Sequence, residues 1–429
     1  MLNLLLSRHT NSMTSRPLVT LPFLMMMTTS WWPQATCSRQ VFDVTNFGAV
    51  ADGLTDNSKA FERAWLKACE SPGRPAVVVP KGEYLLHPVV FRGPCRGYVE
   101  MRVAGVVRAP AGLDAFRGYH EWINFAGIDG LLLTGGGTFD GRGASSWHLN
   151  DCPRKPDCIP PPSSIKLGRV RNATITGVTS LDSKFFHVTI VGSHDVEISH
   201  VSIRAPRDSP NTDGVHIQGS SNVRVTDTAV GTGDDCVSVG PGSADVTVSG
   251  VSCGPGHGIS VGSLGRSPGE AGVRRLRVSN CTIAGTANGV RIKTWRGGGP
   301  TPAAAASSSA AAAAAVSGLV FEDIVMRRVR NPIIIDQEYC PYVSCHHQSE
   351  RRWSPSVVRI SDVKFRNIRG VSATQVAVKL SCSAARPCRG LELRDIDLRY
   401  VRRGVATVSR CANVAGGVAG GTLVPPSCI

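Results

Sequence analysis

Short stretches with apolar residues at alternate positions recur along the chain from residue 173 onward. Each copy has an apolar, any, apolar triplet, followed a few residues later by further apolar residues. The eight copies begin at Ala173, Val196, Val223, Val246, Leu276, Leu319, Val363 and Leu391. They start 23 to 44 residues apart and are separated by Gly, Asn, Asp and Ser. Short strands that repeat at such a spacing are typical of solenoids.

The repeat predicts an all-β fold, a parallel β-helix. Repeated βαβ units would place amphipathic helices of about ten residues between the strands, and the sequence shows none in this region. A β-sandwich would not require strands at a repeated spacing along the sequence. In a β-helix each turn of chain buries its apolar row against the turns before and after it. We therefore expect a single domain over residues 41–428.

One helix and one insertion interrupt the pattern of strands. Asn57-Ser58 can cap a helix from Lys59 to Ala68, which would cover the open N-terminal end of the solenoid. Residues 297–317 are rich in Ala, Ser and Gly and predict a low-complexity surface loop.

A second alignment inside the repeat brings polar residues together. Four segments share a polar residue, a small residue and two apolar residues that flank one more: Asp213-Gly-Val-His-Ile, Asp235-Cys-Val-Ser-Val, His257-Gly-Ile-Ser-Val and Asn288-Gly-Val-Arg-Ile. The first three begin 22 residues apart. Neighbouring strands lie about 4.8 Å apart, so we expect Asp213, Asp235 and His257 in one column. The outward positions are then His216, Ser238, Ser260 and Arg291, followed by Gln218, Gly240, Gly262 and Lys293.

Asp234 precedes Asp235 and would point to the opposite face of a regular strand. The glycines at 231 and 233 indicate a turn or bulge that aims both side chains into one groove. Three carboxylates held this close raise the pKa of at least one of them, as a neutral acid catalyst requires. Pairs of carboxyl groups cleave glycosidic bonds in this way. Each Asp taken alone is more often a structural turn residue, so the prediction depends on their shared register.

Composition excludes some classes of protein and favours an acidic partner. The chain has 429 residues, with 42% hydrophobic and 18% charged residues, too few charges for a disordered chain. No apolar run reaches the roughly 18 residues that a membrane helix needs, so we expect no membrane association. The net charge of +15 favours an acidic partner such as nucleic acid, anionic lipid or an acidic polymer.

The N-terminus and the cysteines predict secretion. Residues 1–35 contain two Arg, no acidic residue and an apolar stretch from Leu18 to Met27, which together resemble a signal peptide. The 14 cysteines are clustered in the sequence, which suits disulfides in an oxidising compartment. The spacing suggests the pairs Cys69/Cys95, Cys152/Cys158, Cys236/Cys253, Cys340/Cys345, Cys382/Cys388 and Cys411/Cys428, with Cys37 and Cys281 left over. Asn172 and Asn280 begin N-glycosylation triplets.

Four motifs occur in an order that resembles a known family: Asn211-Thr-Asp213, Gly233-Asp-Asp-Cys236, Gly256-His-Gly258 and Arg291-Ile-Lys293. They are similar to the motifs of the polygalacturonases, the family-28 glycoside hydrolases. The segments at 46–53 and 288–295 further resemble the plant members. The resemblance implies a right-handed parallel β-helix and hydrolysis of α-1,4-linked galacturonan with inversion, without a cofactor or metal.

The resemblance also implies roles for single residues. Asp234 matches the general acid, while Asp213 and Asp235 match the pair that activates water. His257 matches a histidine that supports the acid. The expected substrate-binding residues are Asn211, Arg291, Lys293 and, less closely matched, Tyr339. Cys236 and Cys253 resemble a bridge between the rung of the acid and that of the histidine.

Two other functions stay open at this point. A pectate lyase shares the β-helix but usually binds Ca²⁺ through several carboxylates. A non-catalytic pectin-binding relative is disfavoured, because every acid of the motifs is present. The resemblance leads us to expect a secreted monomer that acts on an acidic polysaccharide of the cell wall and binds no nucleic acid.

Overall fold

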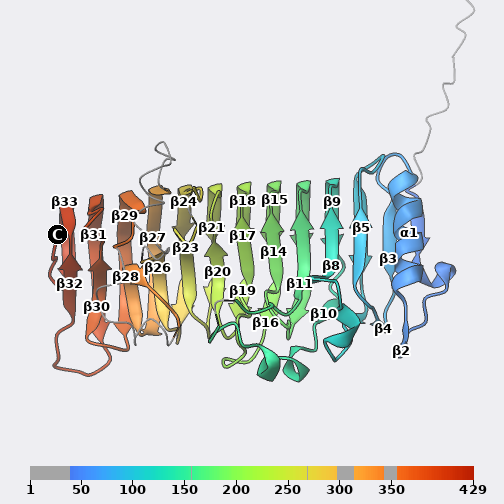
Figure 1. The fold of residues 1–429 in the computed structure, drawn as a ribbon, viewed down its shortest axis with the longest axis horizontal. Coiled ribbons are helices and arrows are strands. Elements are labelled where there is room, and N and C mark those ends of the chain that lie inside the picture. The colour runs from blue at the N-terminus through green and yellow to red at the C-terminus, as the bar shows by residue number, and fades with distance from the viewer. Residues whose placement is uncertain (1–38, 156, 268, 297–313, 343–354) are drawn as a thin grey trace, which may run out of the picture. The chain divides into compact units, whose positions relative to one another are not determined.

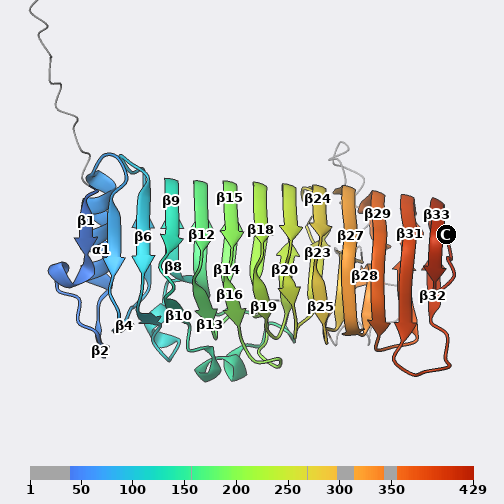
Figure 2. The same ribbon diagram turned by 180° about the vertical axis from the view of Figure 1, so that it is seen from behind.

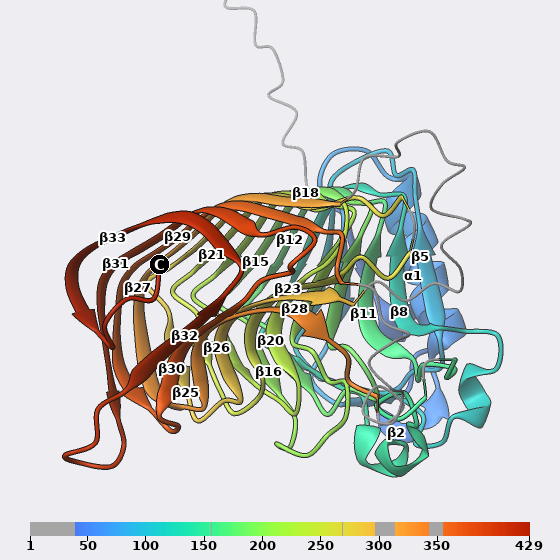
Figure 3. The ribbon, with the colours of Figure 1, turned by 60° about the vertical axis from the view of Figure 1, so that its left-hand side comes forward.

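The computed structural model describes residues 39–429, except 156, 268, 297–313 and 343–354. Within these residues the chain winds through successive turns whose strands lie side by side and parallel (Figure 1). The strands form a 22-stranded sheet and an 11-stranded sheet. Figure 3 shows them on different walls, with β30 and β32 on one and β29 and β33 on another. The predicted all-β parallel β-helix is confirmed.

Up to β26, each strand of the 11-stranded sheet follows two or more strands of the 22-stranded sheet, and from β27 onward the two sheets alternate strand by strand. The 11-stranded sheet contains β5 (Val89–Arg92), β8 (Glu121–Ala126), β11 (Ser163–Gly168), β14 (Val188–Val191), β17 (Val215–Gln218), β20 (Asp235–Val239), β23 (Gly258–Leu264), β26 (Asn288–Trp295), β28 (Asn331–Tyr339), β30 (Val376–Ser381) and β32 (Val408–Ala412). The 22-stranded sheet contains β1 (Val41–Asp43), β2 (Asp52–Asp56), β3 (Ala76–Val79), β4 (Glu83–Leu85), β6 (Val99–Val103), β7 (Val106–Arg108), β9 (Asp129–Thr134), β10 (Thr138–Asp140), β12 (Arg171–Thr176), β13 (Thr179–Leu181), β15 (His194–Ser199), β16 (Ser202–Arg204), β18 (Ser221–Thr226), β19 (Ala229–Gly231), β21 (Ala244–Ser249), β22 (Ser252–Cys253), β24 (Val273–Ser279), β25 (Thr282–Ala284), β27 (Ala315–Val329), β29 (Arg359–Ser372), β31 (Cys388–Tyr400) and β33 (Val414–Val424).

The register of the 22-stranded sheet follows the repeat in the sequence. The first residues of the eight copies pair in one continuous row from Ala173 to Leu391. Every residue of this row is buried. A shift of one residue in any strand would turn its apolar side chains outward, so burial fixes the register.

Asn and Asp occupy a repeated backbone position at the start of these strands. Asn172, Asp195, Asn222 and Asp245 have φ of 53°, 55°, 52° and 55°. This left-handed region favours Asn and Asp among residues with a side chain, because their short polar groups bond locally. The same backbone conformation therefore recurs at the second residue of four successive strands, β12, β15, β18 and β21.

A single α-helix closes the first turns of the solenoid. Helix α1 (Ser58–Glu70) lies at the end of the stack beside β1 (Figure 2) and also contacts β3. Its Trp65 packs on Phe91, with ring centroids 5.1 Å apart, and donates from Nε1 to the Arg92 carbonyl at 3.0 Å. The predicted cap differs in detail, because Asn57 makes no side-chain cap bond. Its side chain bridges Val50, Thr55 and Leu85 instead.

Four short 3₁₀ helices complete the secondary structure of the described residues: η1 (Val44–Phe47), η2 (Asp114–Phe116), η3 (Gly143–Ser145) and η4 (Trp147–Leu149). No helix in the described part of the chain is long and apolar enough to cross a membrane.

Five of the suggested cysteine pairs are disulfides in the structure: Cys69–Cys95, Cys152–Cys158, Cys236–Cys253, Cys382–Cys388 and Cys411–Cys428. Cys281 is buried and free. Cys37 and Cys345 lie outside the described residues, as does the segment interpreted as a signal peptide.

The predicted surface loop at 297–317 falls mostly outside the described residues. Its last residues differ from the prediction, because β27 already begins at Ala315. Val316 is buried and pairs with Val273 on one side and Ile360 on the other. A buried apolar residue in register continues the solenoid, so the strand starts before the low-complexity segment ends.

Candidate active site

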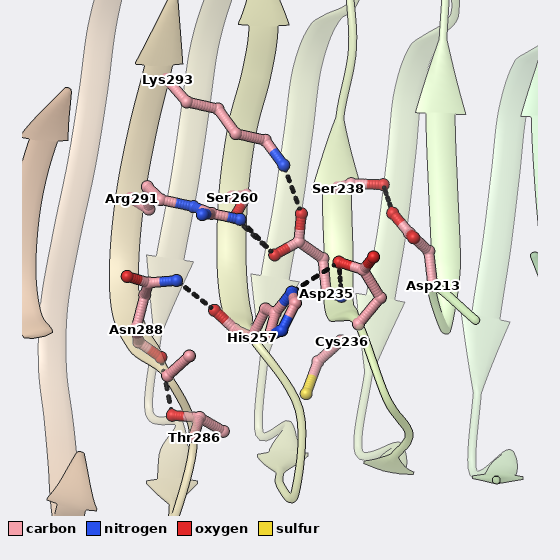
Figure 4. A network of polar contacts seen from close by, with 12 residues as sticks. Asp213, Asp235, Cys236, Ser238, His257, Ser260, Thr286, Asn288, Arg291 and Lys293 are labelled. Carbon is pink, nitrogen blue, oxygen red and sulfur yellow. Dashed lines mark hydrogen bonds and ion pairs between the residues drawn. The ribbon is translucent and has the colours of Figure 1, made fainter. Parts of the chain in front are cut away.

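Four adjacent strands of the 11-stranded sheet, β17, β20, β23 and β26, together with the turns that lead into them, carry the polar residues singled out in the sequence (Figure 4). The outward row pairs as predicted: His216 with Ser238, Ser238 with Ser260, and Ser260 with Arg291. Val215 pairs with Val237, which places Asp213 and Asp235 one rung apart. Residues up to 80 positions apart in the chain thus lie on one face of one sheet.

The predicted column of Asp213, Asp235 and His257 is wrong in its third member. Asp235 pairs with Gly258, while Val237 pairs with Ile259, so β20 contains one residue more than β23 at this point. This irregularity shifts His257 by one position, and its Nδ1 lies 2.8 Å from Oδ1 of Asp234. His257 is therefore the partner of Asp234, because a β-bulge separates the two registers.

The backbone before β20 brings Asp234 close to Asp235. A Cβ at Gly233 would lie 2.0 Å from the Ser209 carbonyl oxygen, so only glycine fits this close approach. Asp234 then accepts the Asp235 amide at Oδ1 over 2.8 Å. One ligand atom each of Asp234, Asp235 and His257 lies within 4.8 Å of the others. The two neighbouring carboxylates therefore share one site, as the bulge prediction required.

Asp235 is the most enclosed of the three carboxylates, with 0% exposure. Its Oδ1 accepts from Ser260 Oγ at 2.7 Å and Arg291 Nη2 at 3.0 Å, and its Oδ2 accepts from Lys293 Nζ at 2.8 Å. Burial opposes ionisation, but the charges of Lys293 and Arg291 outweigh it and lower the pKa of Asp235. Asp235 is therefore a carboxylate with both oxygens occupied.

Asp213 has a different environment one rung away. It is 6% exposed, and its Oδ2 accepts from Ser238 Oγ at 2.7 Å. Burial raises the pKa of Asp213 well above its ordinary value, and the negative charges of Asp234 and Asp235 raise it further. The raised pKa that the sequence predicts for at least one of the three carboxylates therefore falls on Asp213.

Asp234 lies at the more open margin of the cluster. Its side chain is 18% exposed and that of His257 is 42% exposed. Asn211 Nδ2 approaches Asp234 Oδ2 at 3.5 Å. Burial alone would lower the pKa of His257, but the hydrogen bond and charge of Asp234 raise it. Asp234 is thus the carboxylate of the cluster that is best placed to reach a bound molecule.

The two cations do more than the sequence predicts, because both are bound to Asp235. Arg291 also donates from Nε to Ser260 Oγ at 3.1 Å, so these bonds use two of its five N–H donors. Tyr339 lies beside them, with its ring centroid 5.9 Å from the Arg291 guanidinium carbon and 5.4 Å from Lys293 Nζ. The structure therefore brings all eight predicted site residues to this face of the sheet.

The donor set fits a divalent cation poorly. Asp234, Asp235 and His257 lie close enough to share an ion. Both oxygens of Asp235, however, already accept from Arg291 or Lys293, whose positive charges would repel a metal. No metal-dependent step is therefore derived for this cluster.

Sequence reasoning assigned no role to several residues of the site. Ser238 and Ser260 stand at predicted outward positions, yet only the structure shows each donating to an aspartate of the preceding rung. Asn150 donates to the Asn211 side chain at 3.2 Å from outside the repeat, where no periodic signal exists. The two serines could have been found by their place in the row, whereas Asn150 could not.

Comparison with known proteins agrees with this geometry. Residues 69–421 match the family described as glycosyl hydrolases family 28. The chain is 41% identical to an exopolygalacturonase from Platanus acerifolia over 88% of this chain and 95% of that protein. It is also 41% identical to a polygalacturonase from Gossypium hirsutum over 90% of each.

The fold is shared with solved structures as well. An endo-xylogalacturonan hydrolase from Aspergillus tubingensis superposes with a TM-score of 0.73 at 22% identity, covering 89% of this chain and 99% of that one. The likeness in fold, together with the match over most of the sequence, confirms the resemblance seen in the four motifs. The chain therefore belongs to glycosyl hydrolases family 28 and is a glycoside hydrolase.

Proposed function

We propose that the protein is a secreted polygalacturonase that hydrolyses α-1,4-galacturonosyl linkages of pectin with inversion at the anomeric carbon. The observation that carries the proposal is the cluster of Asp213, Asp234 and Asp235 beside Arg291 and Lys293. Carboxylates supply the acid and base chemistry, and the cations suit a polymer with one carboxylate per sugar. Relatives named polygalacturonase support this substrate.

Asp234 is the proposed general acid, which protonates the leaving oxygen. It is the most exposed of the three carboxylates, and its contact with His257 supports it once its proton has gone. A positively charged imidazole beside a carboxylate favours the ionised form that the acid reaches after proton transfer. Proton transfer of this kind contributes about 10²–10⁴-fold to rate.

Asp213 and Asp235 are the proposed pair that holds and deprotonates the attacking water. Arg291 and Lys293 keep Asp235 ionised, as a base requires. Inverting glycosidases separate acid and base by roughly 6.5–9.5 Å, which leaves room for this water. The water would approach the sugar from the face opposite Asp234.

The proposed substrate contacts lie around the same carboxylates. Remaining N–H donors of Arg291 and Lys293 would bind the carboxylate of the sugar next to the cleaved bond, with Tyr339 packing against the ring. Asn211 would contact the substrate beside Asp234. Because Lys293 and Arg291 also hold Asp235, substrate binding and base ionisation would depend on the same two side chains.

The protein is proposed to act outside the cell. Five disulfides within the described residues suit an oxidising compartment. The two asparagines of the glycosylation triplets, Asn172 and Asn280, are exposed. We expect a secreted monomer, and fractionation of culture medium with light scattering would test both points.

Incubation with polygalacturonate tests the proposal directly. The protein should release reducing ends without forming an unsaturated sugar, and chelator should not slow it. An unsaturated product would indicate a lyase instead. Product length on a defined oligogalacturonide would separate removal of end residues from internal cleavage.

A matched pair of variants links the activity to the site. D234N should lower turnover by about 10²–10⁴-fold with little change in melting temperature. D245N removes an exposed carboxylate on the other sheet, where it pairs with Arg275, and should leave turnover unchanged. Full turnover of D234N would remove Asp234 from the mechanism.

A further inference from the structure

A chain of two hydrogen bonds reaches Asp213 from a histidine outside the four motifs. Ser238 Oγ lies 2.7 Å from Asp213 Oδ2 and 2.8 Å from His216 Nδ1. A hydroxyl has one proton to donate. When Ser238 gives that proton to the Asp213 carboxylate, it must accept from His216, whose Nδ1 then carries the hydrogen.

The imidazole of His216 is half-buried and contacts several side chains. The Phe186 ring packs on it with centroids 4.8 Å apart and planes tilted by 31°, and Phe185 stacks on Phe186 at 4.2 Å. Gly240, directly after β20, lies against the ring, and a Cβ built on it would be 3.4 Å from His216 Cε1. Nε2 lies 3.4 Å from the Gln218 side-chain oxygen.

Asp213 and Asp235 each accept a hydrogen bond from a serine, but the two serines have different partners. Ser238 serves Asp213 as Ser260 serves Asp235, each from the following rung. Arg291 Nε is hydrogen-bonded to Ser260 Oγ, whereas His216 Nδ1 is hydrogen-bonded to Ser238 Oγ. Asp213 lacks the direct ion pairs of Asp235 among the hydrogen bonds of the described residues.

The charges that face this chain of contacts come from β26 and from β20 with the turn before it. Asp234 and Asp235 repel negative charge on Asp213, and Lys293 partly offsets them. Lys293 and Asp235 also act on His216 with opposite signs. Burial lowers the pKa of His216 to about 4, so the ring is neutral at higher pH. On the preceding rung Thr189 pairs with His216 and carries no charge.

We propose that His216 is a positioning residue that, through Ser238, holds Asp213 as a hydrogen-bonded carboxylate ready to accept a proton from water. The inference rests on the proposed function and deepens it. His216 fixes the direction of the Ser238 proton, which points at Oδ2 of Asp213. The other oxygen, Oδ1, is left to face the water. Without this donation a buried carboxylate beside two others has little to favour its ionised form.

The pH dependence of kcat/KM on polygalacturonate tests the chain of contacts. S238A should move the acidic limb of the pH profile to higher pH by about one to two units, because a hydrogen bond to the ionised form of Asp213 is lost. H216F keeps a ring between Phe186 and Gly240 but has no donor, so it should shift the limb in the same direction by less. H216N retains an N–H near Nδ1 and should restore the limb.

A matched histidine–serine pair on the other sheet provides the control. His194 Nδ1 lies 2.6 Å from Ser221 Oγ, and H194F should leave the limb unmoved. An unmoved limb in H216F would overturn the role of His216, even if S238A shifts. Equal slowing of S238A and H216F at every pH would also overturn it, since a purely structural role predicts that result.

Stability against pH provides a readout that does not depend on activity. A carboxyl group whose pKa is raised on folding stabilises the fold most below its unfolded value of about 3.9, and this stability is lost as pH rises through the folded value. S238A raises the pKa of Asp213 further, so its deficit in melting temperature should be larger at about pH 7 than at about pH 3. An equal deficit at both would contradict the inference. If the wild-type protein fails to hydrolyse polygalacturonate, the proposed function fails, and the same comparison of melting temperatures made on H216F still decides the role of His216.

Discussion

At the scale of single residues, the three aspartates differ in what surrounds them. Two cations stabilise the ionised form of Asp235, whereas burial and two neighbouring carboxylates oppose the ionisation of Asp213. Asp234 lies at the margin of the cluster beside His257. The same side-chain type therefore has three different environments within one cluster, and burial and neighbouring charge decide which form of each carboxyl group is stable.

Lys293 should affect chemistry as well as substrate binding. K293M removes the partner of Asp235 Oδ2, and Asp235 is fully buried. We expect kcat to fall and KM to rise, with a loss of stability of up to about 3 kcal/mol, since Arg291 remains. K155M breaks an exposed pair with Asp151 and serves as control. A change in KM alone would show that Lys293 binds substrate without supporting Asp235.

His257 should make stability depend on pH in a defined direction. Its pKa is raised by Asp234, so its contribution is complete below the unfolded value of about 6.5 and is lost as pH rises through the folded value. H257Q should therefore have a lower melting temperature than the wild type at about pH 5 and the same melting temperature at about pH 9. The same deficit at both would mean that the charge of His257 does not act on Asp234.

At the scale of elements, the alternation of apolar residues predicts the strands and their register well. The row from Ala173 to Leu391 needs only a period of two and burial on one face. The position of His257 could not be predicted in this way, because the extra residue in β20 leaves no mark in the hydrophobic pattern. Asn57 is at the N-cap of α1 as predicted, but its side-chain bond to the Leu85 carbonyl could not be predicted, because only folding brings Leu85 near.

The disulfide between Cys236 and Cys253 joins the rungs of Asp235 and His257. C236A/C253A should lose about 3 kcal/mol of stability, the loss expected for a loop of 17 residues, and should also lower turnover. Cys411–Cys428 has the same separation of 17 but lies at the C-terminal end of the chain. C411A/C428A should lose stability with turnover retained. Equal turnover in the two variants would show that the bond does not help to place the site.

At the scale of the whole molecule, charge connects the protein to its proposed substrate. A chain with a net charge of +15 attracts a polyanion, and salt screens exposed charges over about 8 Å at physiological ionic strength. We expect kcat/KM on polygalacturonate to fall as salt rises, with less effect on a trimer than on the polymer. Measurement over a salt series would check this. Equal sensitivity for both substrates would place the attraction at the cleft alone.

The stereochemistry of the first product tests the central claim, that neighbouring rungs place an acid and a water-activating pair on opposite sides of one linkage. Proton NMR can follow a defined oligogalacturonide from the moment that the wild-type enzyme is added. The new reducing end should first appear as the β-anomer and then equilibrate, because water attacks the α-linkage from the opposite face. A first product in the α-form, or an unsaturated sugar, would contradict the account.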